Sequence, residues 1–177
     1  AASFALLVYV SAWLKYYYPA AFAAALINSQ PMGFYAPSQL VRDARRHGVT
    51  VLPVDVNASH WDCTLEPIDA AAQRAPDHRP GSRQLPRHWA LRLPFRLLHG
   101  IPSSAVLAIQ QARAAGGPFC SLADFTRRTS LGRALVMRLS QAGIFASLSR
   151  DRRAALWDAL AQDKQAEHLP LLSALPA

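Results

Sequence analysis

Hydrophobic residues recur at helical spacing through the first 48 residues of the chain. SFALLVYVSAWLKYYYP (3–19) carries phenylalanine, leucine and valine about one turn apart, and its proline ends the pattern. A second short helix is predicted over AAFAAALINS (20–29). A third is predicted over QLVRDARRH, with Ser38 as its N-cap and Gly48 just past its end. The sequence therefore predicts three helices before the first strand.

Short strands are predicted from three segments. VTVLPVDV (49–56) contains Pro53, which confines a strand to a sheet edge or ends it, and CTLEP (63–67) is a further candidate. WALRLPFRL (89–97) alternates, so that its tryptophan, leucines and phenylalanine face one side while Arg92 and Arg96 face the other. We expect this third segment to be a half-buried edge strand with a basic outer face.

After these strands the pattern predicts short helices almost throughout. A helix from about Ser103 to Ala114 should be stopped by Gly-Gly-Pro at 116–118, and Ser121 and Asp124 have capping-box spacing for the next helix. LGRALVMRLSQA and DRRAALWDALAQD are predicted as two more helices. The fold class is therefore mainly α with a few short β strands.

Composition changes divide the chain into parts. Residues 69–88 lose periodicity and gain proline, arginine and glycine, which predicts a flexible linker between a part at 1–68 and a part at 89–163, with a tail at 164–177. No membrane span is expected, because the uncharged stretch 16–41 is broken by prolines and polar residues. No signal peptide is expected either, and the chain is predicted to start within a longer protein.

Charge is concentrated in the middle of the chain, within a net charge of +8. Residues 71–150 hold 12 arginines against 2 acidic residues, whereas residues 1–70 and 151–177 each carry a net charge of −1. Arginine suits bidentate contacts to phosphate, so a polyanion is the expected partner. Biased genomic base composition is the alternative explanation for the arginine content. Cys63 and Cys120 form no CxxC pair, which favours a reducing, cytoplasmic setting.

A candidate phosphate-binding hairpin precedes the helix expected at residue 103. Gly100 would let the chain bend, Ile101 would plug the hairpin into the core, and Ser103 and Ser104 would supply N–H and hydroxyl donors at a helix N-terminus. The alternative is an ordinary helix start with proline in its first turn. The spacing resembles the helix-hairpin-helix pattern, but Pro102 stands where the pattern has a second glycine, and proline has no N–H to give.

A second, weaker hairpin candidate is AGIFAS, in which Gly143 takes the turn position and Phe145 replaces the second glycine. Three arginines directly follow this second candidate and would assist both hairpins: Arg150, Arg152 and Arg153. These residues and the amides around Gly100 and Gly143 are the candidate DNA contacts.

The N-terminal third resembles the C-family bacterial DNA polymerases, the replicase alpha-subunit group. SFALLVYVSAWLKYYYPAAF is similar to the end of the fingers domain in the whole group, and NSQPMGFYAPSQLVRDARRHGV and PVDVNASHWDCTLE resemble the error-prone branch. In that family a strand and a tandem helix-hairpin-helix domain follow, which matches the order of WALRLPFRLLHGIP, SLADFTRR and LSQAGIFASLSRDRRAALWDAL. The resemblance implies that 1–68 is the C-terminal part of the fingers and that 89–163 is an edge strand plus a tandem helix-hairpin-helix DNA-binding domain.

This resemblance implies error-prone, damage-tolerant DNA synthesis with a role in DNA repair for the parent protein. The Mg²⁺-binding carboxylates of such polymerases lie in a palm domain, which would precede this chain, so the fragment itself is expected to have no catalytic residue, metal ligand or cofactor. Four scattered acids are therefore not assigned as metal ligands: Asp43, Asp55, Asp62 and Glu66. The implied partner is the phosphate backbone of duplex DNA, with other polymerase or damage-response proteins as further partners and no membrane.

Two other classes of function stay open at this point. One is a free-standing helix-hairpin-helix accessory module without polymerase activity, and the other is a helical protein-interaction scaffold. Within HWDC, strand geometry would separate the side chains of His60 and Asp62 from that of Cys63, which argues against a thiol active site. The arginines of RDARR either touch a nucleic-acid backbone or form a solvated helix face.

Overall fold

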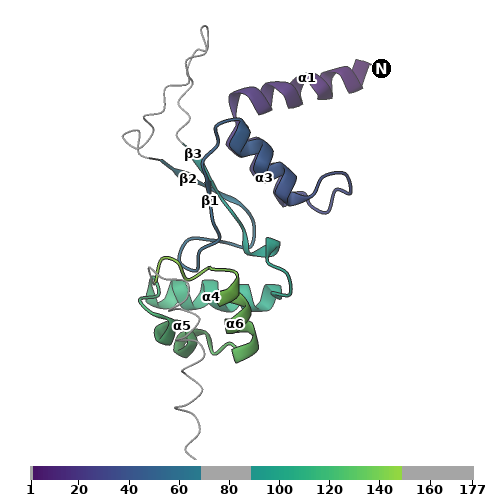
Figure 1. Cartoon of the computed structure of the whole chain (residues 1–177). Coiled ribbons are helices and arrows are strands. Elements are labelled where there is room, and N and C mark those ends of the chain that lie inside the picture. The colour runs from purple at the N-terminus through teal and green to yellow at the C-terminus, as the bar shows by residue number, and fades with distance from the viewer. Residues whose placement is uncertain (1, 69–88, 149–177) are drawn as a thin grey trace, which may run out of the picture. The chain divides into compact units, whose positions relative to one another are not determined.

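A computed structural model describes residues 2–68 and 89–148 of the chain (Figure 1). Within these residues it contains six α-helices and three short strands, which confirms the predicted fold class. The chain divides into two compact units, the first formed by Ala1–Val54 and Ser59–Leu97 and the second by Asp55–Ala58 and Leu98–Ala177. In the described part of the chain, no helix combines the length and the apolar character that crossing a membrane requires.

The first unit begins with three helices, as predicted. They are α1 (Ala2–Tyr17), α2 (Pro19–Asn28) and α3 (Pro37–Arg46). Gly48 follows the end of α3 with a φ of 78°, the left-handed conformation for which glycine is favoured.

The predicted N-cap of α3 is wrong. The N-cap is Ala36, because Pro37 occupies the first helical position, where a missing N–H costs nothing. The side-chain oxygen of Gln39 accepts a hydrogen bond from the Ala36 N–H at 3.1 Å. Ser38 therefore lies inside the first turn.

Three short strands form one sheet in the order β1-β3-β2: β1 is Val51–Leu52, β2 is Thr64–Pro67 and β3 is Trp89–Arg92. β3 runs parallel to β1 and antiparallel to β2, with Leu91 opposite both Val51 and Leu65. The prediction that this strand lies at an edge is wrong, since it has a neighbour on both sides. Its central place explains why Leu91 is completely buried.

The strand predicted over 89–97 is also shorter than expected. β3 ends at Arg92, and Phe95–Leu97 form a 3-10 turn, η2. Pro94 cannot donate a ladder hydrogen bond, and the Phe95 N–H bonds to the carbonyl of His60 at 2.9 Å instead. The predicted alternation holds at Leu91 and Phe95, which are fully buried, but Trp89 is 51% exposed and Ala90 and Pro94, expected on the outer face, are buried.

Small side chains dominate the core of the first unit. Alanines at three positions of α2 are buried, which lets α2 lie close to α3 and the sheet; the buried cluster is Ala20, Ala23, Ala24, Ile27, Leu40, Ala44, Val49, Cys63 and Leu91. Asn28 fixes the approach to β2, because its side chain accepts from the Cys63 N–H at 2.7 Å and donates to the Cys63 carbonyl at 3.3 Å.

The second unit contains α4 (Ser103–Gly116), α5 (Leu122–Thr129) and α6 (Arg133–Gln141). All three helices were expected, and the N-cap of α5 is confirmed, since the Ser121 hydroxyl accepts from the Asp124 N–H at 3.1 Å. The helix predicted from Asp151 lies outside the described residues.

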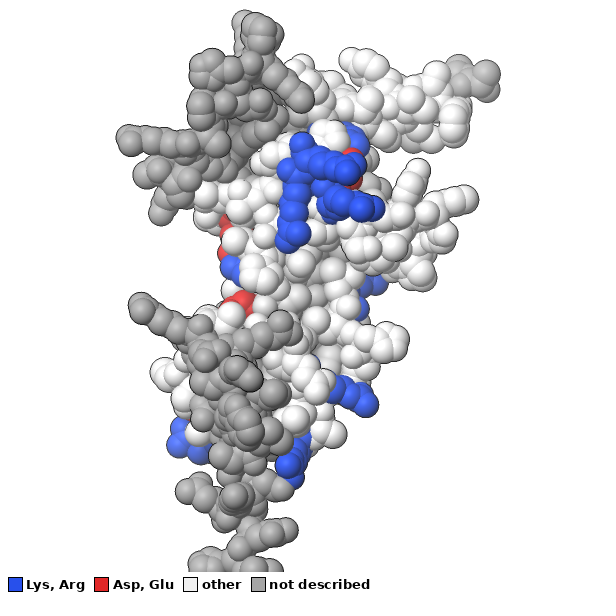
Figure 2. Space-filling model, in the orientation of Figure 1, with Lys and Arg blue, Asp and Glu red and all other residues white. Residues whose placement is uncertain are grey.

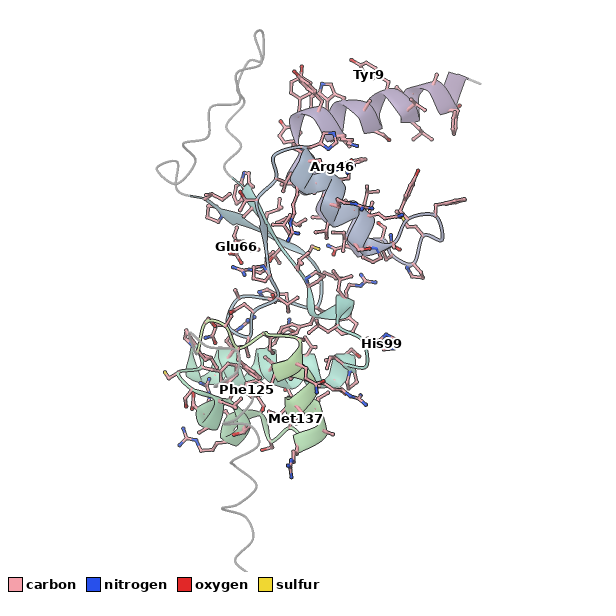
Figure 3. All side chains as sticks on the ribbon, viewed as in Figure 1. Tyr9, Arg46, Glu66, His99, Phe125 and Met137 are labelled. Atoms are coloured by element: carbon pink, nitrogen blue, oxygen red, sulfur yellow. The ribbon has the colours of Figure 1, made fainter. Side chains whose placement is uncertain are left out.

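Three phenylalanines form the centre of the second unit; Figure 3 labels one of them, Phe125. The Phe125 ring is completely buried and lies 5.1 Å from the Phe119 ring and 5.0 Å from the Phe145 ring, centroid to centroid. Both contacts are edge-to-face, the geometry that aromatic quadrupoles favour. This aromatic cluster holds α5 against the segment that follows α6.

A short segment from the N-terminal part of the sequence completes the second unit. Val56 is fully buried, and its N–H donates to the carbonyl of Ile144 at 2.9 Å. The Asn57 side chain accepts from the Phe119 N–H at 2.8 Å and donates to the Phe119 carbonyl at 3.0 Å. The segment Asp55–Ala58 is therefore a structural part of this unit.

The predicted domain limits 1–68, 69–88, 89–163 and 164–177 stay a prediction, because the linker and the tail lie outside the described residues. The contacts do assign β3 to the first unit and Asp55–Ala58 to the second.

Candidate nucleic-acid interface

The first hairpin has the backbone conformation that its sequence predicts. Gly100 has a φ of 73°, in the left-handed region that glycine favours. Ile101 is 8% exposed, so its side chain plugs the turn into the second unit. Pro102 is the N-cap of α4, and Figure 3 shows His99 on the loop just before the turn, pointing outward. The turn thus exposes its glycine and anchors its isoleucine.

Two serine amides remain available at the start of α4. Ser103 and Ser104 are the first two helical residues and both are exposed. N–H groups in the first turn of a helix have no acceptor within the helix. The Ala105 N–H is engaged, since it donates to the Pro102 carbonyl at 3.1 Å. The donors at this hairpin are therefore the amides and hydroxyls of the two serines, at the positive end of the α4 dipole.

An arginine that the sequence analysis missed lies beside this turn. Nη1 of Arg138, on α6, donates to the Gly100 carbonyl at 3.2 Å, and the side chain is exposed. A Cβ atom added to Gly100 would lie 2.9 Å from the same Nη1. Because the two residues are 38 positions apart, only the tertiary fold brings this charge to the hairpin.

The second hairpin uses its glycine to turn the chain. Gly143 has a φ of 76°, and its N–H donates to the Ser140 carbonyl at 2.9 Å. Ile144 and Phe145 are buried, whereas Ala146 and Ser147 are exposed. The Gly143 amide is thus already engaged inside the protein. Arg150, Arg152 and Arg153, predicted to assist this hairpin, lie outside the described residues.

The predicted basic face of the third strand is wrong. Arg92 is only 13% exposed in its side chain and forms a two-pronged pair with Glu66, at 2.6 and 2.7 Å. Arg96 donates to Asp62 at 2.8 Å and to the carbonyls of Asn28 and Gln30 at 2.7 and 2.8 Å. Both guanidinium groups therefore stabilise the first unit: Arg92 also donates to the carbonyl of Pro53 at 2.9 Å, and Arg96 satisfies carbonyls at the C-terminal end of α2.

Hydrogen bonds from Arg92 lower the pKa of Glu66 below its ordinary value, against the opposing effect of burial. A lowered pKa means that the pair stabilises the fold above the ordinary glutamate pKa and loses this contribution as the pH falls through the lowered value. Replacing Glu66 by glutamine should lower the free energy of unfolding by about 1 kcal/mol at pH 7, since the pair is partly solvated. At a pH below the lowered pKa of Glu66, the same replacement should change the free energy of unfolding little.

Urea unfolding followed between pH 3 and 7 measures this difference, with Arg92→Ala as the partner variant. The gap between each variant and the unchanged chain should narrow as the pH falls below about 4.3. A gap that stays constant across this range would refute the assigned role of the Glu66 charge.

Arginines of α5 also have structural partners. Arg128 pairs with Asp124 at 3.0 Å and lies over the Phe119 ring at 4.4 Å. It also donates to the carbonyl of Ala112, near the C-terminal end of α4, and to that of Gly117, just past the helix. Hydrogen bonding from Arg128 lowers the pKa of Asp124. Arg128 therefore caps the C-terminal end of α4.

Basic side chains gather over α3 in the first unit (Figure 2). Arg42, Arg45 and Arg46 are all exposed. Between them, Asp43 pairs with Lys15 at 2.9 Å, and this hydrogen bond lowers the pKa of Asp43. Both interpretations of this helix face, nucleic-acid contact and solvated surface, are compatible with such exposure.

The cysteine and the acidic residues considered in the sequence analysis have structural roles. Burial raises the pKa of the Cys63 thiol to about 11, which leaves it without the thiolate that a nucleophile needs. The acids Asp43, Asp62 and Glu66 each pair with a different basic residue, and Asp55 accepts from the Asn57 N–H at 2.8 Å. Among residues 2–68 and 89–148, no three His, Cys, Asp or Glu side chains gather as a metal site would require.

Known proteins resemble this chain over almost its whole length. The family described as a helix-hairpin-helix motif matches residues 48–155, more than half of the chain. An error-prone DNA polymerase of Rhodopirellula baltica is 49% identical over 176 residues, which are 99% of this chain and 14% of that protein. Error-prone DNA polymerase 1 of Rhizobium meliloti is 50% identical over 175 residues, 97% of this chain and 16% of that protein.

The error-prone DNA polymerase of Anaeromyxobacter dehalogenans strain 2CP-C is 53% identical over 162 residues, 91% of this chain and 13% of that protein. The chain thus spans about a seventh of the length of these curated relatives.

Proposed function

The chain belongs to the helix-hairpin-helix motif family, and from this membership we infer that its second unit binds the phosphate backbone of duplex DNA without reading the base sequence. Sequence-independent binding follows from the donors offered: backbone amides, hydroxyls and arginine meet phosphate oxygens, which are the same at every base pair. The exposed start of α4 beside Gly100 and Arg138 is the observation that carries the proposal.

For the parent protein, the proposed activity is error-prone, template-directed DNA synthesis in DNA repair. Identity near 50% across almost the whole chain to proteins named error-prone DNA polymerase supports this proposal over a free-standing accessory module or an interaction scaffold. We place the parent in the cytoplasm with the DNA, and its Mg²⁺-binding carboxylates outside this chain. Residues 1–177 alone should therefore bind DNA and synthesise none.

At the first hairpin, a phosphate would approach Gly100 next to the Arg138 guanidinium, which lies where a Cβ of residue 100 would point. The N–H groups and hydroxyls of Ser103 and Ser104 would donate to its oxygens, assisted by the α4 dipole. Pro102 supplies no N–H, so this hairpin has one backbone donor fewer than the family pattern. Arg138 would supply charge at the same place. Around Gly143, the amides of the exposed residues Ala146 and Ser147 would act similarly, assisted by Arg150, Arg152 and Arg153.

Salt dependence tests the proposal directly. The affinity of the chain for duplex DNA should fall linearly with salt on logarithmic axes, as counterion release requires. Arg138→Gln should weaken binding equally for unrelated DNA sequences and reduce the salt slope by about 1. Fluorescence anisotropy with two unrelated duplexes at several salt concentrations gives both quantities. Absence of binding at low salt would remove the proposal.

A pair of glycine variants separates DNA contact from folding. Gly100 and Gly117 have nearly equal positive φ angles, 73° and 72°, at opposite ends of α4. Leucine at Gly100 should cost a backbone strain of about 1–2 kcal/mol and would press on the Arg138 guanidinium. Leucine at Gly117, whose ψ is −169°, should be strained at least as much but would meet no neighbour within 4 Å. Only Gly100→Leu should weaken DNA binding, by about tenfold for one lost phosphate contact. Equal loss of affinity in the two variants would contradict the assignment of this hairpin.

A further inference from the structure

Helix α1 is apolar and uncovered. Its large hydrophobic side chains are exposed over its whole length, and the most exposed are Phe4 at 72%, Tyr9 at 68%, Tyr16 at 66%, and Leu6 and Leu7 at 63% each. In Figure 2 the helix forms a surface without acidic or basic colour along most of its length. Soluble proteins rarely leave so large a continuous apolar surface in water without a partner.

The apolar surface surrounds the helix. A helix turns by about 100° per residue, so Leu6, Leu7, Val8, Tyr9 and Val10 together face every direction around the axis. Figure 3 shows Tyr9 projecting from the α1 ribbon. The one charged residue of α1, Lys15, is already paired with Asp43 at 2.9 Å. No side of α1 is therefore polar enough to face solvent.

This pattern excludes several occupants. A helix lying on a membrane surface needs a strongly polar face, which α1 lacks. A second copy of the chain would cover one stripe and leave the other sides in water. A helix that is hydrophobic all round belongs inside the core of a large protein.

We propose that α1 is a core helix of a larger domain, and that the remainder of the parent polypeptide covers it on several sides with apolar surface. The Rhodopirellula baltica relative matches 99% of this chain, α1 included, within a protein of which the match is 14%. That protein contains ample further chain to enclose the helix. The proposal rests on the chain being a segment of a longer protein and is independent of DNA binding.

Thiol labelling of single-cysteine positions tests the proposal. Ser3→Cys, Ala5→Cys and Ser11→Cys are small replacements at exposed positions on three different sides of α1, and Ser38→Cys on α3 is the exposed control. Labelling is read peptide by peptide by mass spectrometry, in residues 1–177 and in the full-length protein. Native Cys63 reacts slowly, because it is buried and burial raises its pKa to about 11. The exposed Cys120 is replaced by serine in every variant, so that it takes up no label.

All four positions should react rapidly in residues 1–177. In the full-length protein, the labelling rates of the three α1 positions should be lower by a factor on the order of ten or more. Unfolding in urea should restore these rates. Unchanged rates in the native full-length protein, or protection on one side only, would overturn the proposal. If residues 1–177 form a dimer in which α1 is protected, a second copy of the chain covers the helix, and this result would also overturn the proposal. Loss of DNA binding would affect none of these outcomes.

Discussion

Replacing Phe125 by alanine is expected to destabilise the second unit by about 3–5 kcal/mol. The ring is completely buried and makes edge-to-face contacts with Phe119 and Phe145 on its two sides. Alanine would remove both aromatic contacts and leave a cavity that α5 and its neighbours fill only in part. Because a typical domain is stable by about 5–15 kcal/mol, this loss would populate the open unit markedly.

Native-state hydrogen exchange measures this loss separately for each unit. The amides of α4, α5 and α6 should lose protection by the expected free energy, while those of the sheet should change little. Leu107→Ala is the matched control, since Leu107 lies on α4 of the same unit and is 54% exposed. Its effect should stay within about 0.5 kcal/mol. Similar losses for the two variants would show that the aromatic cluster does not hold the unit together.

Asn57→Ala is the second substitution with a large expected effect, about 2–4 kcal/mol on the second unit. The variant leaves both the N–H and the carbonyl of Phe119 without the partners that Asn57 provides, and Phe119 is only 2% exposed. Buried backbone groups without partners carry the full cost of their desolvation. A change close to the β1 strand in sequence should thus weaken the helices that follow residue 98.

The same exchange measurement locates the effect of Asn57→Ala. Protection should fall in α4 to α6 by more than in the sheet, and Asn57→Asp should lose less, because it keeps an oxygen to accept from the Phe119 N–H. Gln111→Ala, at an exposed position of α4, is the control without an expected effect. A loss confined to the sheet would contradict the assignment of Asp55–Ala58 to the second unit.

Local patterns predicted most of the helices because their signals are contained in neighbouring residues. The start of α4 after Pro102, the N-cap Ser121 and the glycine after α3 depend on backbone geometry within a few positions. Hairpin geometry at Gly100 and Ile101 followed in the same way, through one positive φ and one buried side chain.

Features that depend on distant partners were missed. The sequence of β3 does not say that strands will flank it on both sides, and the charge of Arg92 and Arg96 does not say which carboxylate each will meet. The alternating pattern predicted that both arginine side chains lie on one side of the segment. Their pairing with Glu66 and Asp62 makes them structural rather than available to a ligand. Arg138 beside Gly100 is the same lesson at the candidate site, since the two residues meet only after α4, α5 and α6 have packed.

The segment Asp55–Ala58 also bears on how the protein is made. Because synthesis proceeds from the N-terminus, Asn57 leaves the ribosome 62 residues before its partner Phe119. At about 5–20 residues per second, that interval lasts about 3–12 s. During it, Val56 and the Asn57 amide have no docking surface. The first unit, whose residues all precede residue 98, can form in that interval, and Asp55–Ala58 stays an undocked loop on it until the rest of the second unit has been made.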